Sequence, residues 1–250
     1  EGYIETNEQG EHDKAIFNGR AKLKLKDRRI EADKITISMK EKTIYAEGNT
    51  FSELKDKNND LITITSDYQE LHWDGNNANA RGNLKTTYLD TKVTAEEASI
   101  IYKENKPDQA LFFSKEKISH LEQPTNITYA KEFVIDIESH DLLANGNVKS
   151  IIWPDKKKSK SDQDPVHVST EKLFIENATG TITAESKINQ VNLTYQDTKG
   201  KSNEATLLRD NKSGKPDKII FKGAANVVQE DKEITSEEVI FNFEDKKKYF

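Results

Sequence analysis

Apolar and polar side chains alternate along most of this chain. The clearest example is residues 30–49, IEADKITISMKEKTIYAEGN, where every second position after Asp33 is apolar: Ile35, Ile37 and Met39. A polar turn over residues 40–42 leads into a second alternating run that ends at Gly48-Asn49. A period of two is typical of a β-strand with one buried side and one solvent-facing side. The stretch therefore predicts two antiparallel strands joined by a turn.

The stretch recurs through the sequence. Each copy starts at an anchor residue, usually an acid, and the anchors are 29 to 40 residues apart: Asp33, Asp67, Glu96, Lys131, Glu171, Glu204 and Glu237. The predicted inward positions lie two, four and six residues after each later anchor: Gln69, Leu71, Trp73; Ala98, Ile100, Tyr102; Phe133, Ile135, Ile137; Leu173, Ile175, Asn177; Thr206, Leu208, Asp210; Val239, Phe241, Phe243. In three copies a Gly-Asn pair follows the anchor by 15 residues, at Gly48, Gly82 and Gly146. Repeats near this period indicate stacked units that each bury a face on their neighbours.

The pattern predicts an all-β fold: an elongated stack of antiparallel strands built from about seven repeats of roughly 33 residues. Helical spacing is absent, and β-branched residues dominate the apolar positions. We expect residues 1–14 to be a frayed lead-in and residues 15–250 to form a single repetitive domain. A polar insert at residues 155–165, between two proline-marked corners, lengthens one repeat, and we expect it to be a solvated loop.

Composition narrows the classes of function. Charged residues make up 33% of the chain and the mean hydropathy is −0.85, values that would suggest disorder if the alternation were absent. The net charge of −6 and the lack of a basic patch argue against nucleic-acid binding. Without cysteine there is neither a disulfide framework nor a thiolate metal site. No apolar run has the length of a transmembrane helix, and the start at Glu1 favours a mature or trimmed chain.

The residue types that carry chemistry are spread through the repeats. A catalytic carboxylate pair needs one local geometry, whereas the anchor acids recur along the chain and Lys131 replaces one of them. The five histidines lie in different repeats without a partner at ligand spacing: His12, His72, His120, His140 and His167. We therefore expect no enzyme activity, no metal and no cofactor. The acids are interpreted as turn-bonding or solubilising residues.

The repeats resemble the OstA-like (LptA-type) domain of the lipopolysaccharide-transport system. The resemblance is carried by the small residue plus acid, the alternating apolar positions and an A-x-G-N ending, found here at residues 46–49, 80–83 and 144–147. It covers about residues 15–250. The copies that start at Glu96, Glu171 and Glu204 lack a clean Gly-Asn ending, and the insert is a further departure.

Members of that family are V-shaped β-jellyrolls, open at both ends, with an apolar lumen that carries acyl chains. The resemblance implies a non-enzymatic carrier or bridge for a lipopolysaccharide-like lipid in the periplasm, stacking end to end with other jellyrolls toward the outer membrane. Membrane contact would be indirect. It implies a lipid-binding lumen lined by Ile35, Ile37, Met39, Leu71, Trp73, Ile100, Tyr102, Phe133, Ile135, Ile137, Leu173, Ile175, Val239, Phe241 and Phe243.

Both ends of the repeat array predict exposed strand edges. The last anchor, Glu237, leaves no room for a following Gly-Asn half, so its strand is expected to lack a partner and to pair with another jellyroll or a second copy. Lys246, Lys247 and Lys248 would limit that pairing. The predicted edge residues are Ile16, Phe17, Leu23 and Leu25 at one end and Val239, Ile240, Phe241, Asn242 and Phe243 at the other.

Two other interpretations remain open. A structural or adhesive β-solenoid with a dry, packed core would use the same inward stripe. A glycan-processing β-solenoid enzyme would need a local cluster of acids, which the sequence does not show. A continuous cavity for acyl chains would separate the carrier from the packed solenoid.

Overall fold

The computed structural model describes residues 2–6, 12–25, 28–73, 77–104, 106–155, 157–210 and 215–243. Over these residues it contains nineteen β-strands and one 3-10 helix, and the strand pairings whose register is defined are antiparallel. The predicted all-β fold of antiparallel strands is confirmed. The chain divides into two compact units: unit 1 comprises residues 1–119 and 136–138, and unit 2 comprises residues 120–135 and 139–250.

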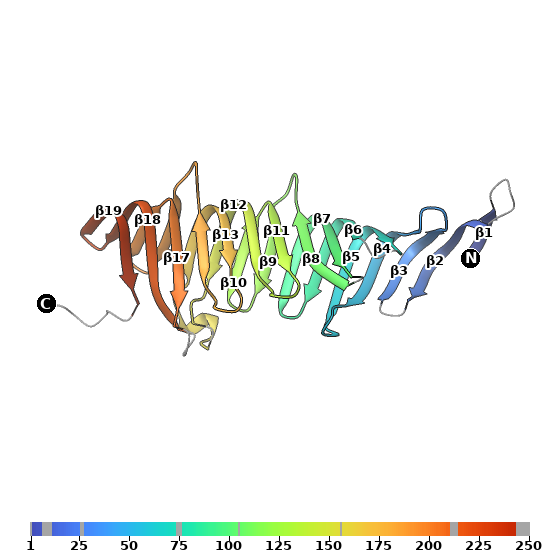
Figure 1. The fold of residues 1–250 in the computed structure, drawn as a ribbon, viewed down its shortest axis with the longest axis horizontal. Helices are drawn as coiled ribbons and strands as arrows, with labels where there is room; N and C mark the ends of the chain where they lie inside the picture. Colours follow the sequence, from blue (N-terminus) through green and yellow to red (C-terminus); the bar gives the residue numbers. More distant parts are fainter. Residues whose placement is uncertain are drawn as a thin grey trace. The chain divides into compact units, whose positions relative to one another are not determined.

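Unit 1 is a meander in which each strand pairs with the next along the chain. Its strands run from blue to green in Figure 1: β1 Gly2–Thr6, β2 His12–Lys24, β3 Arg28–Ser38, β4 Thr43–Lys55, β5 Leu61–His72, β6 Asn77–Tyr88, β7 Thr91–Lys103 and β8 Lys106–Phe113. The connections that are fully described, at residues 39–42, 56–60 and 89–90, are short turns, as hydrophobic alternation interrupted by polar residues requires.

The long strands of unit 1 are interrupted near their middle by a bulge. The register shifts between Glu47 and Thr50 in β4 and between Arg81 and Leu84 in β6. At these points Gly48 and Asn49 have φ angles of +73° and +46°, and Gly82 and Asn83 have +77° and +47°. Two successive left-handed residues bend a strand sharply, and glycine adopts that region without steric cost. The Gly-Asn pairs are therefore mid-strand bends and not strand ends.

Unit 2 repeats this arrangement with shorter pieces: β9 Ser119–Gln123, β10 Asn126–Ala130, β11 Glu132–Asp136, β12 Leu142–Ile152, β13 Val166–Ile175, β14 Ile182–Glu185, β15 Val191–Tyr195, β16 Thr198–Ser202, β17 Glu204–Arg209, β18 Pro216–Gln229 and β19 Lys232–Asn242. β9 begins at Ser119, which ends the first segment of unit 1, and the other residues of β9 belong to unit 2. β10 and β11 are separated by Lys131 alone, and both pair with the continuous β12. β16 and β17 are separated by Asn203, and both pair with β18. Each such pair corresponds to one bent strand of unit 1 that is interrupted at its bend.

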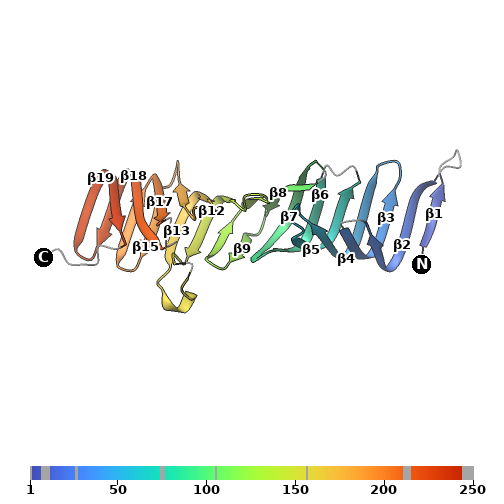
Figure 2. The same cartoon turned by 60° about the horizontal axis from the view of Figure 1, so that its bottom comes forward.

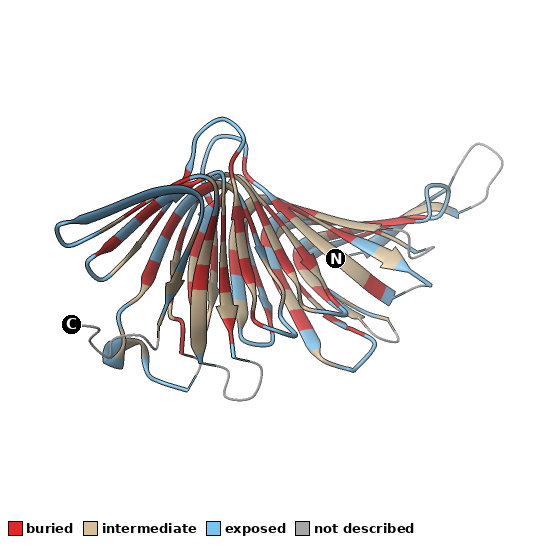
Figure 3. Cartoon of the chain, turned by 60° about the vertical axis from the view of Figure 1, so that its left-hand side comes forward, coloured by how far each residue is buried: buried red, intermediate tan, exposed pale blue. Residues whose placement is uncertain are grey.

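Buried positions alternate with half-buried and exposed ones along the strands, as Figure 3 shows. The alternation changes phase at the anchors of β3, β5 and β7 and is kept through the Gly-Asn bends of β4 and β6. In β3 the buried side chains before Asp33 are Ile30 and Ala32, at even positions, whereas Ile35 after it is at an odd position. The register explains the difference: β3 advances three residues across the bend, from Glu31 to Lys34, while β4 advances four, from Glu47 to Phe51, so β3 changes parity and β4 does not.

The N-terminal residues differ from the prediction of a frayed lead-in. β1 pairs with β2, with Tyr3 opposite Ile16 and Ile4 opposite Ala15. The Ala15–Phe17 part of the predicted edge is therefore already paired on that side, and β1 takes its place as the outer strand. Residues 2–6 form a strand because pairing with β2 satisfies the backbone N–H and C=O groups on one of its sides without an apolar pattern of its own.

The insert at residues 155–165 also differs from the predicted solvated loop (Figure 1, Figure 2). It contains the 3-10 helix η1, Lys160–Asp162. The amide of Gln163 bonds to both backbone groups of Asp155, at 2.8 Å and 2.9 Å, and Asp155 is buried. The Lys160 ammonium lies 4.5 Å from the ring centroid of Trp153. The loop is thus folded on its own unit by amide and cation–π contacts, which a polar composition does not reveal.

Candidate functional site

The interior of unit 1 lies between the two halves of its bent strands. We define wall 1 as the halves at residues 28–32, 50–55, 61–66, 84–88 and 91–95, and wall 2 as the halves at residues 34–38, 43–47, 68–72, 77–81 and 97–103. Buried side chains of both walls pack in one cluster, Ile30 and Ala32 from wall 1 against Ile35, Ile44, Ala46 and Leu71 from wall 2. The bend thus folds each strand over its own apolar face.

A narrow cavity of about 30 Å³ remains between the walls. Its inward-facing lining is mostly aliphatic and comes from both walls: Ile30, Leu54 and Ile64, and Ile44, Ala46, Leu71, Ala80, Ala98 and Ile100. This volume holds a few water molecules at most. An acyl chain can enter only if the walls move apart.

The rim opposite the bends is crossed by side chains from one wall to the other. The guanidinium of Arg28, at the start of β3, lies 4.7 Å from the ring centroid of Tyr102, near the end of β7. A cation–π contact at a partly exposed site contributes about 0.5–1 kcal/mol. We call this rim the seam. Because β3 and β7 are not paired with each other there, the contact is held by side chains alone.

A second contact near the seam involves buried polar groups. The Tyr88 hydroxyl donates to Oδ2 of Asp56 at 2.8 Å and lies 3.4 Å from the backbone oxygen of Ile137, a residue of the same unit. Oδ1 of Asp56 accepts the N–H groups of Asn58 and Asp60 at 2.8 Å and 2.7 Å. Burial, followed by the bond to Asp56, raises the pKa of Tyr88 well above its usual value. The hydroxyl therefore stays protonated and donates.

The interior of unit 2 is packed around fully buried side chains, among them Phe133, Leu173, Ile219 and Phe221. Tyr195 of β15 lies against two rings of β19, with centroid distances of 6.4 Å to Phe241 and 4.9 Å to Phe243. Burial raises the pKa of Tyr195. Since β15 and β19 are not paired with each other, these rings join separate parts of the unit, as Arg28 and Tyr102 do in unit 1.

The predicted lumen residues divide into three groups. Seven are buried: Ile35, Leu71, Ile100, Phe133, Ile135, Ile137 and Leu173. Six are half-buried: Ile37, Tyr102, Ile175, Val239, Phe241 and Phe243. The remaining two do not face the interior, since Met39 is 42% exposed and Trp73 is 44% exposed. β3 ends at Ser38 and β5 ends at His72, so both residues lie in the following turns and the alternation no longer orients them.

Sequence reasoning missed half of the interior. It followed the strand after each anchor and overlooked the half before it, including Ile30, Ile62, Val93 and Val166, all at 4% exposure or less. It also placed one anchor a residue too late. The inward residues of β17 are Ala205, Leu207 and Arg209, whereas the predicted Thr206 and Leu208 are half-buried and Asp210 is exposed. Shifting that anchor to Asn203 restores the pattern.

Two anchor acids bind a loop where the Gly-Asn ending is missing. The carboxylate of Glu96 accepts the N–H groups of residues 115–117 at 2.7–3.2 Å, and Glu171 accepts those of residues 187–189 at 3.0–3.1 Å. The bond from Glu116, with those from Lys115 and Lys117, lowers the pKa of Glu96. The bonds from Asn189, Lys187 and Ile188 lower the pKa of Glu171. A lowered pKa holds each group as an anion that caps a loop, a role unlike that of a general acid.

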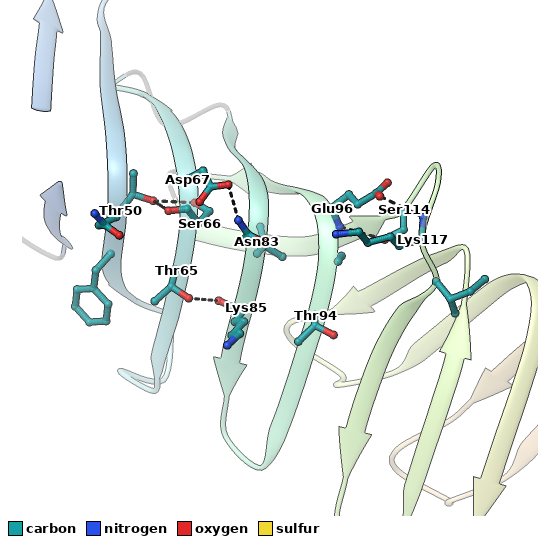
Figure 4. Close-up of a pocket in the computed structure, with 15 residues that line it drawn as sticks. Thr50, Thr65, Ser66, Asp67, Asn83, Lys85, Thr94, Glu96, Ser114 and Lys117 are labelled. Atoms are coloured by element: carbon teal, nitrogen blue, oxygen red, sulfur yellow. Dashed lines mark hydrogen bonds between the residues drawn. The ribbon is translucent and has the colours of Figure 1, made fainter. Parts of the chain in front are cut away.

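A polar groove of about 640 Å³ lies along the bends of β4–β7 (Figure 4). In the figure Asp67 and Asn83 meet at the bend, with 2.8 Å between Oδ2 and Nδ2, and Thr65 and Lys85 lie farther along the strands. Thr50 and Ser66 bond to each other at 2.8 Å. The polar groups of this groove are thus largely bonded among themselves and serve the bends.

Within the described residues, β19 has one unpaired side, whereas the predicted N-terminal edge on β2 is covered in part by β1. In unit 2, β19 pairs with β18, and no comparable pairing covers its other side. Ile234 and Ile240 of β19 are 56% and 50% exposed, and Tyr3 and Ile4 of β1 are 50% and 60% exposed. At the predicted N-terminal edge, Ile16 is buried, Phe17 is exposed, and Leu23 and Leu25 are half-buried. The predicted Lys246–Lys248 block lies outside the described residues.

The described residues hold no group of three or more His, Cys, Asp or Glu side chains placed to bind a metal ion. Within the same ranges, no helix has the length and apolar character needed to cross a membrane.

Comparison with known proteins found similarity among solved structures alone. No protein-family model matches the chain, and no curated protein matches it. Among solved structures it is similar to LptH, described as the LptA homologous periplasmic component of the conserved lipopolysaccharide transport device from Pseudomonas aeruginosa. The identity is 15%, the match covers 54% of this chain and 94% of that chain, and the TM-score is 0.45. The description of LptH names the family that the repeats resemble, but at this similarity no residue role passes from LptH to this chain.

Proposed function

We propose that the chain is a non-enzymatic carrier or bridge for a lipid of the lipopolysaccharide kind in the periplasm. The observation that carries the proposal is the apolar interior of unit 1, enclosed by two walls that are continuous at the bends. At the seam, among the described residues, Arg28 contacts Tyr102 from the other wall while β3 and β7 are not paired with each other. Such walls can separate without breaking a strand pairing, since hydrogen bonds run within each wall.

The energetics favour apolar chains as cargo. Each methylene transferred from water into an apolar interior contributes about 0.8 kcal/mol. The buried side chains of both walls are mainly apolar; the polar ones among them are Ser38, Thr43, Thr50, Ser52, Ser66, Gln69 and Thr86, and the Gln69 amide donates to the Ile64 carbonyl at 3.2 Å. A lipid would therefore be bound through its acyl chains, and apolar contact alone would not distinguish one acyl-chain structure from another. The repeat resemblance supports lipopolysaccharide as the cargo class.

Native mass spectrometry of the purified protein tests whether lipid is bound. Photo-crosslinking groups then locate it. Probes at Ile100, which lines the cavity, or at Ile35, which is buried in the adjoining cluster, should capture lipid, and probes at the outward Thr36 or Ile101 should not. In unit 2, Phe133 and Ile135 should behave like Ile35, whereas the intervening Val134 should not. Equal capture from both faces would contradict a lipid-filled interior.

One observation favours the alternative, a structural β-solenoid with a dry core. The cavity is small, and many inward side chains of unit 2 are fully buried, such as Leu173 and Val191 at 0% exposure. A dry core would give purified protein without lipid, capture from neither face, and unfolding that does not change when lipid is added.

A further inference from the structure

Two polar side chains are buried in the largely apolar lining of the cavity of unit 1. Ser52 of β4 and Gln69 of β5 line this cavity and are 7% and 8% exposed, and the other buried residues that line it are aliphatic. Ser52 belongs to wall 1 and Gln69 to wall 2. A polar group loses its hydrogen bonds to water on burial, so a polar pair in an apolar interior requires an explanation.

Strand pairing brings Ser52 and Gln69 to the same part of the cavity. Ser52 lies directly opposite Ile64 in the β4–β5 ladder, and both side chains are buried. The side-chain amide of Gln69 donates to the carbonyl of Ile64 at 3.2 Å. The amide is therefore held beside the residue that pairs with Ser52, close to the bend of β5 between Ser66 and Tyr68.

Both side chains keep a hydrogen-bonding group free toward the cavity. Among the described residues, neither the Ser52 hydroxyl nor Oε1 of Gln69 has a hydrogen-bond partner. A serine hydroxyl both donates and accepts, whereas an amide oxygen only accepts. A ligand group that satisfies both must therefore donate a hydrogen bond to Gln69.

A hydroxyl fits this pair better than the other polar groups of lipids do. It donates to Oε1 of Gln69 and accepts from Ser52 at the same time. The carbonyl of an ester or ketone only accepts, and it leaves Oε1 without a donor. A carboxylate or phosphate would bring a charge between apolar walls, at a large cost in lost hydration.

We infer that Ser52 and Gln69 bind a hydroxyl group carried on the acyl chain of the lipid. This inference rests on the proposed function and deepens it, because it names a hydroxylated acyl chain as the favoured ligand. The site lies near the bend of β5, where the two walls are continuous. It is therefore kept when the walls move apart at the seam to admit a chain.

The test compares stearic acid with 12-hydroxystearic acid as competitors of a fluorescent polyene fatty acid, below the concentrations at which they aggregate. The measured quantity is the affinity for the hydroxy acid divided by that for stearic acid, a ratio that cancels the shared apolar contacts. In the unaltered chain this ratio should be one or higher, although the hydroxyl makes the acid less apolar. Ser52→Ala should lower the ratio about fivefold, the loss expected for one hydrogen bond, and Gln69→Met should lower it similarly.

Thr86→Val is the matched control. Thr86 flanks Ile64 on the β6 side, is 6% exposed, and its hydroxyl has no partner among the described residues. Unlike Ser52, it is not among the residues that line the cavity. Thr86→Val removes a buried hydroxyl from the same wall and should leave the ratio unchanged. A fall as large as that of Ser52→Ala would show that the two cavity residues are not the site.

Urea midpoints add a second measurement. Ser52→Ala should not lower the midpoint, because its hydroxyl has no bond to lose, and a lower midpoint would overturn the inference by showing that the hydroxyl is engaged in the free protein. Gln69→Met loses the bond to Ile64, so its midpoint should fall. If Gln69→Met does not fold, Ser52→Ala decides the result.

The outcomes separate the inference from the proposed function. If the polyene acid does not bind the unaltered chain, or neither competitor displaces it, the proposed function fails. If the acids bind but the ratio is below one in the unaltered chain, or is the same in Ser52→Ala, the hydroxyl site is wrong and the carrier function stands.

Discussion

The side-chain amide of Asn49 donates a hydrogen bond to Oδ2 of Asp33 at 2.7 Å, across the bend shared by β3 and β4. Asn83 makes the same bond to Asp67 at 2.8 Å. The anchor acid and the Gly-Asn ending, separated in the sequence, are thus two halves of one contact. A Cβ on Gly48 would lie 2.7 Å from Oδ2 of Asp33, so this position requires glycine for both its φ angle and its space.

Gly48→Ala should therefore destabilise the fold more than Gly19→Ala. Both glycines have positive φ, but a Cβ on Gly19 would meet nothing within 4 Å. We expect a loss of about 1 kcal/mol in the free energy of unfolding for Gly19→Ala, from backbone strain alone, and about 2–3 kcal/mol for Gly48→Ala. Urea denaturation measures both. Equal losses would contradict the close approach of Asp33, and the difference should shrink in an Asp33→Ala background, which removes Oδ2 but keeps the Cβ at 3.1 Å.

Glu96→Gln should make stability less dependent on pH. The N–H groups of residues 115–117 lower the pKa of Glu96 below its usual 4.5, so its folded-state pKa is depressed. Its contribution to stability is then fully present above about pH 4.5 and is lost as pH falls through the folded pKa. Glu96→Gln should be less stable than the unaltered chain near neutral pH, and the gap should close in acid. Urea midpoints at several pH values measure this, with the exposed Glu97→Gln as the control.

A constant gap between Glu96→Gln and the unaltered chain at all pH values would contradict the capping role. Glu171→Gln should behave in the same way, because Glu171 accepts the corresponding three N–H groups.

Hydrophobic alternation predicts the strands and part of the interior. Ile35, Leu71 and Phe133 are buried as predicted, because a period of two determines the facing of every side chain after the bend. Ile30 was missed because β3 crosses the bend in three residues, an odd number, so the half before Asp33 has the opposite parity. A sequence search that allowed a phase change at each anchor would have found both walls.

The misplaced anchor at Glu204 has a different cause. The prediction required an acid, whereas the structure requires a backbone N–H. The N–H of Asn203 donates to the carbonyls of Lys222 and Gly223, at 3.1 Å and 2.9 Å, and the N–H of Lys131 donates to those of Asn145 and Gly146. Any non-proline residue can supply this donor, so side-chain type marks the position imperfectly. The seam contacts were beyond prediction, since they join residues that share no strand pairing.

Tyr88→Phe should destabilise unit 1. The change removes the donor to Asp56 and leaves a buried carboxylate with fewer bonds, at an expected cost of about 1.5–3 kcal/mol. Tyr129→Phe is the control, because Tyr129 is 41% exposed and its ring stacks on His120 without needing its hydroxyl. Chemical denaturation of both variants provides the comparison. A loss for Tyr88→Phe no larger than for Tyr129→Phe would show that the Asp56 bond adds nothing.

The last prediction concerns the outer edge of β19, where we propose that another jellyroll or a second copy pairs. The N–H of Phe243 donates to the carbonyl of Asp217, at the start of β18. Because backbone groups alternate sides in an antiparallel ladder, the N–H of Phe241 also faces β18, and that of Ile240 faces the outer edge. Ile240→Pro should therefore weaken association and leave the fold intact, whereas Phe241→Pro removes a donor within the unit and should lower stability by about 1–3 kcal/mol. Sedimentation velocity over a range of concentrations measures association, and urea denaturation measures stability. If Ile240→Pro leaves concentration-dependent oligomers unchanged, pairing through this edge is wrong. If the unaltered chain stays monomeric at every concentration, self-association is wrong and the partner at this edge must be a different protein.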